Sequence, residues 1–293
     1  MGQVLAIFGP TGIGKTALAV ALADRLRTAG DRPVAVSADA LQVYRGLEVL
    51  TGVASAPEQE RLEHRLVSCV PVDRTWSVAE HAARAHAEID ALLAQGRTPI
   101  VVGGTGLYLR AALTELELRP PPPPQLRARL QAELAEQGPE ALHARLPAAT
   151  RERVAARDAK RIVRALELAE LGQDLHRGDQ LWTAQTRHPT RLVGLTMQRD
   201  ALRARIDARV DAMVAAGAAD EVRRADAAGA SATARKALGF RELLAGDVDA
   251  MKAATRRYAR RQLTWMRKLA GVELVDVTGR EPDAVADALL PGA

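Results

Sequence analysis

The sequence predicts an α/β fold in which helices cover a parallel sheet, together with a small helical insertion. Short, continuously apolar runs alternate with stretches of helical spacing, a pattern typical of parallel sheets that are buried on both faces. The first run, VLAIF at 4–8, leads into a glycine-rich loop followed by a helix-like stretch. Five consecutive prolines at 120–124 then interrupt the alternation, because proline is unfavourable in a helix and in a central strand.

Each expected element follows from its local pattern. A helix that ends at Gly30 is expected after the glycine loop, because apolar residues recur there at helical spacing. The other expected strands are the apolar runs at 33–39, 98–106 and 191–197, with a weaker candidate at 272–277. The other expected helices lie at 79–96, about 125–137, 139–146 and 159–171, about 200–217 and about 247–270. The expected domains are the first part of the core (1–113), a helical insertion domain (114–189), and the second part of the core with a basic C-terminal helix (190–293).

The composition narrows the class of protein. The 293 residues suffice for one large domain or two modest ones. The single cysteine, Cys69, excludes an internal disulfide and a cysteine-based zinc cluster, so a cytoplasmic location is expected. No apolar run reaches the length of a membrane-spanning helix and no leader pattern precedes the first strand, so no membrane partner is expected. The net charge of +5 weakly favours a polyanionic partner.

The glycine loop carries the strongest local motif in the chain. Residues Gly9 to Thr16 fit the pattern G-x-x-x-x-G-K-[ST] and stand between a strand and a helix, as that pattern requires. The glycines allow backbone N–H groups to surround an anion, and the helix N-terminus adds partial positive charge. Lys15 is expected to reach the outer phosphates and Thr16 to bind Mg²⁺. The motif predicts a P-loop NTPase-like core that binds a pyrophosphate or polyphosphate, as nucleotide- and ATP-binding proteins do.

The loop alone suggests an NTPase or a kinase, but the other expected strands lack a feature that these enzymes have. Such enzymes carry an apolar strand that ends in an Asp supporting Mg²⁺. The expected strand at 98–106 ends in glycines instead, whereas Asp39 ends the strand before it and is followed by ALQVYRGL, which is not typical of a nucleotidase switch. A small-molecule kinase therefore remains open as an alternative on these residues.

Seven blocks of sequence, in order, resemble the bacterial tRNA dimethylallyltransferases (tRNA isopentenyltransferases). The blocks are GPTGIGKT (9–16), SADALQVYRGL (37–47), VVGGTGLYLRAAL (101–113), KRIVRALE (160–167), RIDARVDAMVAAGAADEV (205–222), ALGFREL (237–243) and TRRYARRQLTWMRK (255–268). The family transfers a dimethylallyl group from dimethylallyl diphosphate to N6 of the adenine on the 3′ side of the tRNA anticodon and releases diphosphate. The resemblance implies that the loop holds the diphosphate of this donor and that ATP is not required.

The resemblance also implies roles for individual residues. Asp39 matches the general base that takes the proton of the adenine amino group, with a helix N-cap or an Mg²⁺ support as alternatives. Thr105 matches a threonine near the reacting carbon, the alternative being a turn cap. Arg209 matches an arginine that stabilises the departing diphosphate, and an ion pair with Asp207 or Asp211 is the alternative. The residues expected to bind diphosphate are Gly9, Thr11, Gly12, Gly14, Lys15, Thr16 and Arg205.

A basic run at 251–268 carries seven basic residues and no acidic one. By itself it is typical of a solvated helix face. The resemblance implies instead that the anticodon stem-loop of tRNA binds here and on the insertion domain. The residues expected to face tRNA, or to support those that do, are Gln42, Lys160, Arg161, Arg164, Arg260, Arg261, Gln262, Thr264 and Trp265. Such basic groups hold phosphates and set register rather than read bases.

The sequence departs from the family pattern at three positions, and other functions remain as alternatives. Val53, Arg65 and Ser68 stand where the family pattern has a lysine, a histidine and an aspartate. Besides the kinase, the alternatives are an adenylate isopentenyltransferase that acts on free nucleotides and a non-enzymatic RNA-binding protein. The expected partners are tRNA, dimethylallyl diphosphate and Mg²⁺, and the expected state is a monomer.

Overall fold

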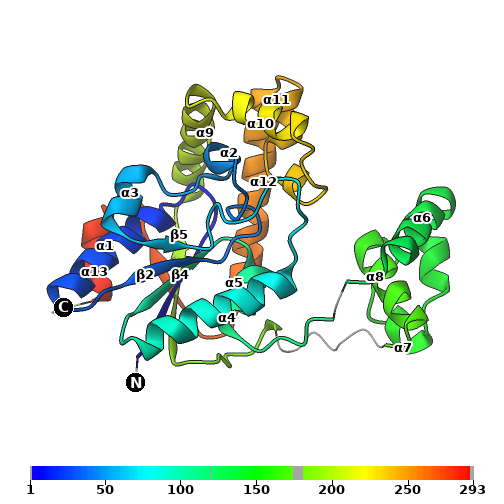
Figure 1. Ribbon diagram of the computed structural model, residues 1–293, viewed down its shortest axis with the longest axis horizontal. Coiled ribbons are helices and arrows are strands. Elements are labelled where there is room, and N and C mark those ends of the chain that lie inside the picture. The colour runs from blue at the N-terminus through cyan, green and yellow to red at the C-terminus, as the bar shows by residue number, and fades with distance from the viewer. Residues whose placement is uncertain (1, 120, 174–180, 291–293) are drawn as a thin grey trace. The chain divides into compact units, whose positions relative to one another are not determined.

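The computed structural model describes residues 2–119, 121–173 and 181–290 (Figure 1). The chain divides into two compact units, one formed by Met1–Leu116 and Leu181–Ala293 and the other by Glu117–Gln180. The first unit holds the sheet, and the second is helical.

The first unit is built on a six-stranded sheet in which every pairing is parallel, with the strand order β3-β2-β4-β1-β5-β6. Its strands are β1 (Val4–Phe8), β2 (Val34–Ser37), β3 (His64–Arg65), β4 (Pro99–Gly103), β5 (Thr190–Thr196) and β6 (Val272–Asp276). The central β1 pairs with β4 (Leu5 opposite Ile100) and with β5 (Leu5 opposite Arg191). The parallel α/β sheet expected from the apolar runs is confirmed, and the weak candidate at 272–277 is the edge strand β6.

Helices cover both faces of the sheet, because alternate residues of a strand point to opposite sides. Leu5 and Ile7 of β1 pack in one apolar cluster with α1 (Lys15–Thr28) and α13 (Pro282–Leu289). Val4, Ala6 and Phe8 pack in another cluster with α4 (Val78–Ala94) and α5 (Gly106–Leu113). The core of the first unit thus consists of two apolar layers separated by the sheet.

A third apolar cluster lies beyond the sheet, where Figure 1 shows further helices gathered above the strands. The elements that contribute to this cluster are α2 (Glu48–Thr51), α9 (Arg199–Ala215), α10 (Ala218–Ala227), η2 (Ala234–Lys236), α11 (Phe240–Leu244) and α12 (Val248–Met266). The short helix α3 (Ala56–Arg61) lies instead beside α1, where Arg61 pairs with Asp24. Of these elements, the sequence predicted only α9 and α12, and it did not predict α13 on the sheet either. Gly217, with φ of 91°, separates α9 from α10, so the helix expected over 200–217 ends before this glycine and a new one starts after it.

The second unit consists of α6 (Pro124–Ala144), α7 (Ala148–Arg151) and α8 (Ala159–Glu170) around a small core that includes Leu130, Leu142 and Ile162. Gly138, with non-helical φ and ψ, separates the two helical stretches expected on either side of it. Pro124 begins α6, so the expectation that all five prolines lie outside helices is wrong for the last one. Proline is tolerated at the first helical position because the N–H there has no partner in the helix.

None of the helices in the described ranges is long and apolar enough to cross a membrane.

Candidate diphosphate and acceptor site

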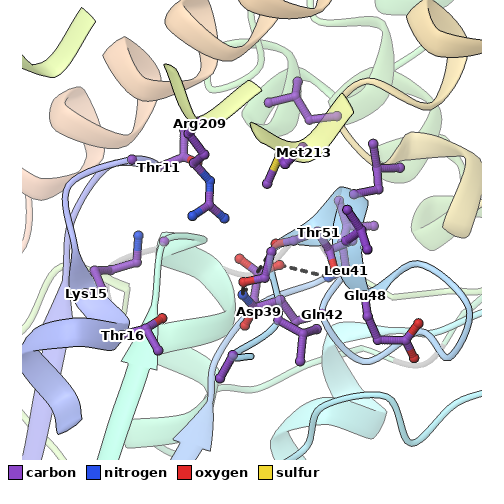
Figure 2. Close-up of a pocket in the computed structure, with 18 of the residues that line it drawn as sticks. Thr11, Lys15, Thr16, Asp39, Leu41, Gln42, Glu48, Thr51, Arg209 and Met213 are labelled. Carbon is purple, nitrogen blue, oxygen red and sulfur yellow. Dashed lines mark hydrogen bonds between the residues drawn. The ribbon is translucent and has the colours of Figure 1, made fainter. Parts of the chain in front are cut away.

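A cavity of about 730 Å³ opens where the parallel strands of the first unit end. Its wall is formed by the loop before α1, by the segment after β2, by the turn after β4, and by α9 and α12 (Figure 2). Open α/β sheets bind ligands at this edge, because the loops that follow parallel strands meet there. Of the residues expected to bind diphosphate or act in catalysis, the cavity is lined by Thr11, Gly12, Gly14, Lys15, Thr16, Asp39 and Arg209.

The phosphate loop has the backbone that an anion site requires. Gly12 and Gly14 have φ of 81° and 100°, a region that favours glycine. A Cβ on Gly12 would lie 3.0 Å from the side chain of Ile206, so this position also lacks room for a side chain. The helix α1 begins directly at Lys15, and its first turn has no acidic residue. The N-terminal amides of α1 therefore present positive potential to the cavity.

The amine of Lys15 is held over this loop. Its Nζ donates hydrogen bonds to the carbonyl oxygens of Gly9 and Pro10, each at 3.0 Å. The pKa of Lys15 is lowered to about 8, mainly by burial and in part by the neighbouring Arg209, while Asp39 opposes the shift. Gly9 and Arg205 stand beside the cavity rather than in its wall, with the guanidinium of Arg205 lying 3.3 Å from a Cβ built on Gly14.

Asp39 follows β2 and faces the cavity from the side opposite Arg209 (Figure 2). Its Oδ1 accepts a hydrogen bond from the backbone N–H of Leu41 at 2.9 Å. This bond closes a turn two residues long, whereas α2 begins only at Glu48, so the alternative of a helix N-cap is wrong. The turn fixes the carboxylate at the cavity wall, where it can accept a proton.

Arg209 points from α9 into the cavity toward Asp39 (Figure 2). Its Nε is buried and has no hydrogen-bond partner among the residues that the structure describes. Burial lowers the pKa of this guanidinium, although Glu58 and Asp39 oppose the shift. Since a buried cation without a full set of acceptors is costly, the arrangement favours an anionic ligand.

The expected alternative for Arg209, an ion pair with a carboxylate on its own helix, is wrong. The carboxylate of Asp207 forms an ion pair with the guanidinium of Arg256, with an N–O distance of 2.5 Å. The carboxylate of Asp211 pairs with the amine of Lys252 at 2.6 Å. Asp207 and Asp211 are thus both engaged by cations of α12, and the guanidinium of Arg209 is directed into the cavity.

The helix α12 joins the phosphate loop to the turn after β4. The Oε1 of Gln262 accepts a hydrogen bond from the backbone N–H of Thr11 at 2.9 Å, and its Nε2 donates one to the carbonyl oxygen of Gly104 at 2.7 Å. Gln262 is only 4% exposed, so of the two expected roles it does not face tRNA itself. Its amide holds two loops of the cavity wall together. No local pattern indicates this role, because the two partners lie far from Gln262 along the chain.

Thr105 lies directly after Gly104 and precedes the first residue of α5. Its Oγ1 lies 3.1 Å from the hydroxyl of Tyr258, whereas it makes no capping bond to α5. The alternative of a turn-capping threonine is therefore wrong. Tyr258 lines the cavity and was missed as a site residue, although its spacing of four from Gln262 places both on one helix face.

Gln42 lines the cavity, but its side-chain amide is engaged within the protein. Its Nε2 donates to the carbonyl of Gly52 at 3.0 Å, and its Oε1 accepts from Ser37 Oγ at 2.9 Å. The amide of Gln42 thus ties the segment around Gly52 to the end of β2, and the expectation that Gln42 faces tRNA stays a prediction.

The remaining residues expected at the tRNA interface fall into two groups. Arg260, Arg261 and Thr264 are exposed on α12, whereas Trp265 packs over Gly106 and lies 4.8 Å from the ring centre of Trp182. In the second unit, Lys160 and Arg161 are exposed on α8. Arg164 on the same helix donates to the buried carboxylate of Glu167 at 3.1 Å, so part of its charge is used within that unit.

Oxygen atoms suitable for Mg²⁺ lie in the cavity wall. Within the described part of the chain, no group of three or more His, Cys, Asp or Glu side chains could hold a metal ion. The hydroxyl of Thr16 and the carboxylate of Asp39 do line the cavity. Mg²⁺ commonly binds one or two protein oxygens together with substrate phosphates, and this donor set fits that pattern.

Together these features define a P-loop protein with a group-transfer site, in which an anion-binding loop and a buried arginine face a carboxylate across one cavity. The chain belongs to the IPP transferase family, whose model matches residues 42–269. It is 43% identical over 283 residues to a tRNA dimethylallyltransferase of Thermobifida fusca, covering 92% of this chain and 88% of the relative.

Two further comparisons extend the match to nearly the whole chain. A tRNA dimethylallyltransferase of Anaeromyxobacter dehalogenans is 42% identical over 301 residues, with 97% of this chain and 98% of the relative covered. The solved structure of a tRNA isopentenylpyrophosphate transferase from Bacillus halodurans matches with a TM-score of 0.71 and 32% identity, over 99% of this chain and 94% of that one.

Proposed function

We propose that this chain transfers a dimethylallyl group from dimethylallyl diphosphate to N6 of the adenine on the 3′ side of the anticodon in tRNA, and releases diphosphate. The observation that carries the proposal is the cavity itself, where Lys15 and Arg209 face Asp39. The relatives named tRNA dimethylallyltransferase support the same reaction. A kinase is disfavoured because β4 ends in Gly103 rather than in the acid that a nucleotidase needs.

The proposed reaction forms a bond from adenine N6 to C1 of the dimethylallyl group while the bond from C1 to the diphosphate oxygen breaks. The electron pair of the broken bond leaves with the diphosphate, and the N6 proton passes to the carboxylate of Asp39. Negative charge grows on the leaving diphosphate, so the loop amides, Lys15 and Arg209 stabilise the transition state more than the ground state.

Apolar side chains complete the proposed donor site. Val49, Leu50, Met213 and Leu238 line the same cavity as the phosphate loop. A five-carbon hydrocarbon chain binds favourably to such a wall because apolar surface is removed from water. The cavity thus offers a charged region for the diphosphate and an apolar region for the group that is transferred.

We further propose that Mg²⁺ binds with the donor, on the hydroxyl of Thr16 and oxygens of the diphosphate. When bound, the ion would neutralise part of the charge of the leaving group. A monomeric state and a cytoplasmic location are also part of the proposal. Light scattering of the purified chain at 31.4 kDa checks the first, and fractionation of the cells that produce it checks the second.

The decisive experiment is mass spectrometry of unmodified tRNA after incubation with the protein, Mg²⁺ and dimethylallyl diphosphate. A mass gain of one C5H8 unit on the adenine 3′ of the anticodon is expected. Transfer to AMP alone would indicate the nucleotide-modifying alternative, and ATP turnover without any transfer would indicate a kinase. If the protein binds tRNA but catalyses neither transfer nor ATP turnover, it would be a non-enzymatic RNA-binding protein.

Asp39→Asn is the matched variant for this experiment. Its side-chain oxygen can still accept from the N–H of Leu41, so the turn after β2 is preserved. Loss of the base should reduce turnover by about 10²–10⁴-fold, while the Kd of tRNA stays the same. Equal losses of turnover and of tRNA affinity would contradict the role of Asp39 as the base.

A further inference from the structure

Tyr258 on α12 has no role in the reaction proposed above. Its side chain lines the cavity, four residues before Gln262, which holds the phosphate loop. Its hydroxyl lies 3.1 Å from the Oγ1 of Thr105, so the two groups are hydrogen-bonded. Tyr258 therefore connects the cavity wall to the threonine expected near the reacting carbon.

The ring of Tyr258 makes a second contact on the exposed side of the same helix. The guanidinium carbon of Arg261 lies 5.4 Å from the ring centre, a distance typical of a cation–π contact. Arg261 is exposed and belongs to the basic run expected to bind tRNA phosphates. One side chain thus contacts both a candidate catalytic group and a candidate tRNA-binding group.

We propose that Tyr258 is a positioning residue that links tRNA binding to the reaction, since its hydroxyl orients Thr105 and its ring supports Arg261. This inference rests on the proposed function. When a tRNA phosphate engages Arg261, the ring beneath that guanidinium is restrained. The hydroxyl of Thr105 is then held in one orientation toward the acceptor.

The protonation of Tyr258 fits positioning rather than proton transfer. The pKa of its hydroxyl is raised to about 12, mainly by burial and in part by the charge of Asp39, while Thr105 and Arg261 oppose the shift. The hydroxyl stays protonated at the pH of any tRNA assay, so it can donate a hydrogen bond but does not serve as a base. Asp39 keeps the role of proton acceptor.

The test uses the full chain with unmodified tRNA, dimethylallyl diphosphate and Mg²⁺. Tyr258→Phe removes the hydroxyl and keeps the ring under Arg261. One neutral hydrogen bond corresponds to a change in rate of about two- to tenfold, so the single-turnover rate should fall by that factor while KM for tRNA stays the same. Tyr258→Ala also removes the ring and should raise KM for tRNA in addition.

A double-mutant cycle separates positioning from a general structural effect. Thr105→Val removes the other partner of the hydrogen bond, so Tyr258→Phe should cause no further loss of rate in a Thr105→Val background. The matched control is Tyr44→Phe, which removes a hydroxyl buried in the third apolar cluster, outside the cavity wall. It should leave the single-turnover rate unchanged.

The outcomes distinguish the inference from the proposed function. No transfer by the unsubstituted chain overturns the proposed function and this inference with it. An active unsubstituted chain with a Tyr258→Phe variant of equal rate overturns the inference alone. So does a full additional loss in the Thr105→Val background, because Tyr258 would then act without Thr105.

Discussion

The charge of Lys15 depends on its surroundings in a way that affects ligand binding. Its amine is buried over the phosphate loop, close to Arg209, and its pKa is lowered to about 8. Only the charged form attracts a diphosphate strongly. A bound diphosphate would in turn favour the charged form and raise the pKa again.

The affinity for inorganic pyrophosphate should therefore fall as the pH rises above about 8. In this range the free protein loses the proton of Lys15, so binding must first restore that proton. Titration calorimetry with pyrophosphate and Mg²⁺ between pH 7 and pH 9.5 measures the effect. Lys15→Arg, which stays charged throughout, should show a much flatter profile. Equal profiles for the two proteins would exclude Lys15 as the titrating group.

His81 affects stability rather than binding. It is fully buried, its ring centre lies 4.9 Å from that of Tyr108 with the rings tilted by 54°, and neither ring nitrogen has a hydrogen-bond partner among the described residues. Burial lowers its pKa from about 6.5 to about 4, with His86 contributing. The folded state therefore contains neutral His81, whereas the unfolded chain binds a proton below about pH 6.5.

The sign of the pH effect on stability follows from these two values. The stability contributed by neutral His81 is fully present above pH 6.5 and is lost as the pH falls toward 4. Urea unfolding at pH 7 and at pH 5 should show a smaller acid-induced loss for His81→Phe than for the unsubstituted chain. The same loss in both proteins would assign the acid sensitivity to other groups.

At the level of elements, α12 is the helix that assembles the site. Its inner face reaches the phosphate loop and the turn after β4 through Gln262, and Thr105 through Tyr258. Its outer face carries exposed arginines, among them Arg260 and Arg261. A single helix thus connects diphosphate binding with the surface expected to meet tRNA.

Gln262→Leu should weaken both the fold and the donor site. The change leaves the N–H of Thr11 and the carbonyl of Gly104 without their partner, and each unsatisfied buried group costs about 1–3 kcal/mol. The melting temperature should fall, and KM for dimethylallyl diphosphate should rise more than KM for tRNA. Ala253→Ser on the same helix is the control. An unchanged donor KM would mean that the loop keeps its shape without Gln262.

At the level of the whole molecule, the chain leaves the first unit and returns to it along adjacent paths. The N–H of Arg187 donates to the carbonyl of Leu113 at 2.8 Å. The guanidinium of Arg187 pairs with Asp90 of α4 and with Glu115, just before the second unit begins. The two segments of the first unit that flank the second unit in the sequence are therefore joined to each other.

Basic side chains in the run at 251–268 that contact tRNA phosphates would make tRNA binding depend on salt. Each phosphate contact to a single strand contributes about 0.7 to the slope of log K against log salt concentration. Arg261→Gln should therefore weaken tRNA binding and reduce this slope by about 0.7. Arg25→Gln removes the same charge from an ion pair with α13 and should leave the slope unchanged. An unaltered slope for Arg261→Gln would remove this residue from the interface.

Local patterns were sufficient to predict the parallel sheet, the phosphate loop and the positions of Lys15 and Asp39. These features depend on contiguous residues: strand β1 is apolar throughout, and the loop motif holds glycines where the backbone has positive φ. The family blocks placed Arg209 on the correct helix for the same reason. Short helices such as α10 and α11 were missed because their apolar residues pack against distant elements rather than form a long periodic pattern.

The partners of the polar side chains depended on the folded arrangement. Gln262 and Gln42 both look like residues available for RNA, yet each uses its amide to join segments within the protein. Thr105 and Tyr258 are 153 residues apart in the chain and meet only because α12 packs beside the turn after β4. Periodicity describes which face of a helix is apolar, but it carries no information about which distant backbone group comes within hydrogen-bond distance. That choice depends on how the helices pack on the sheet.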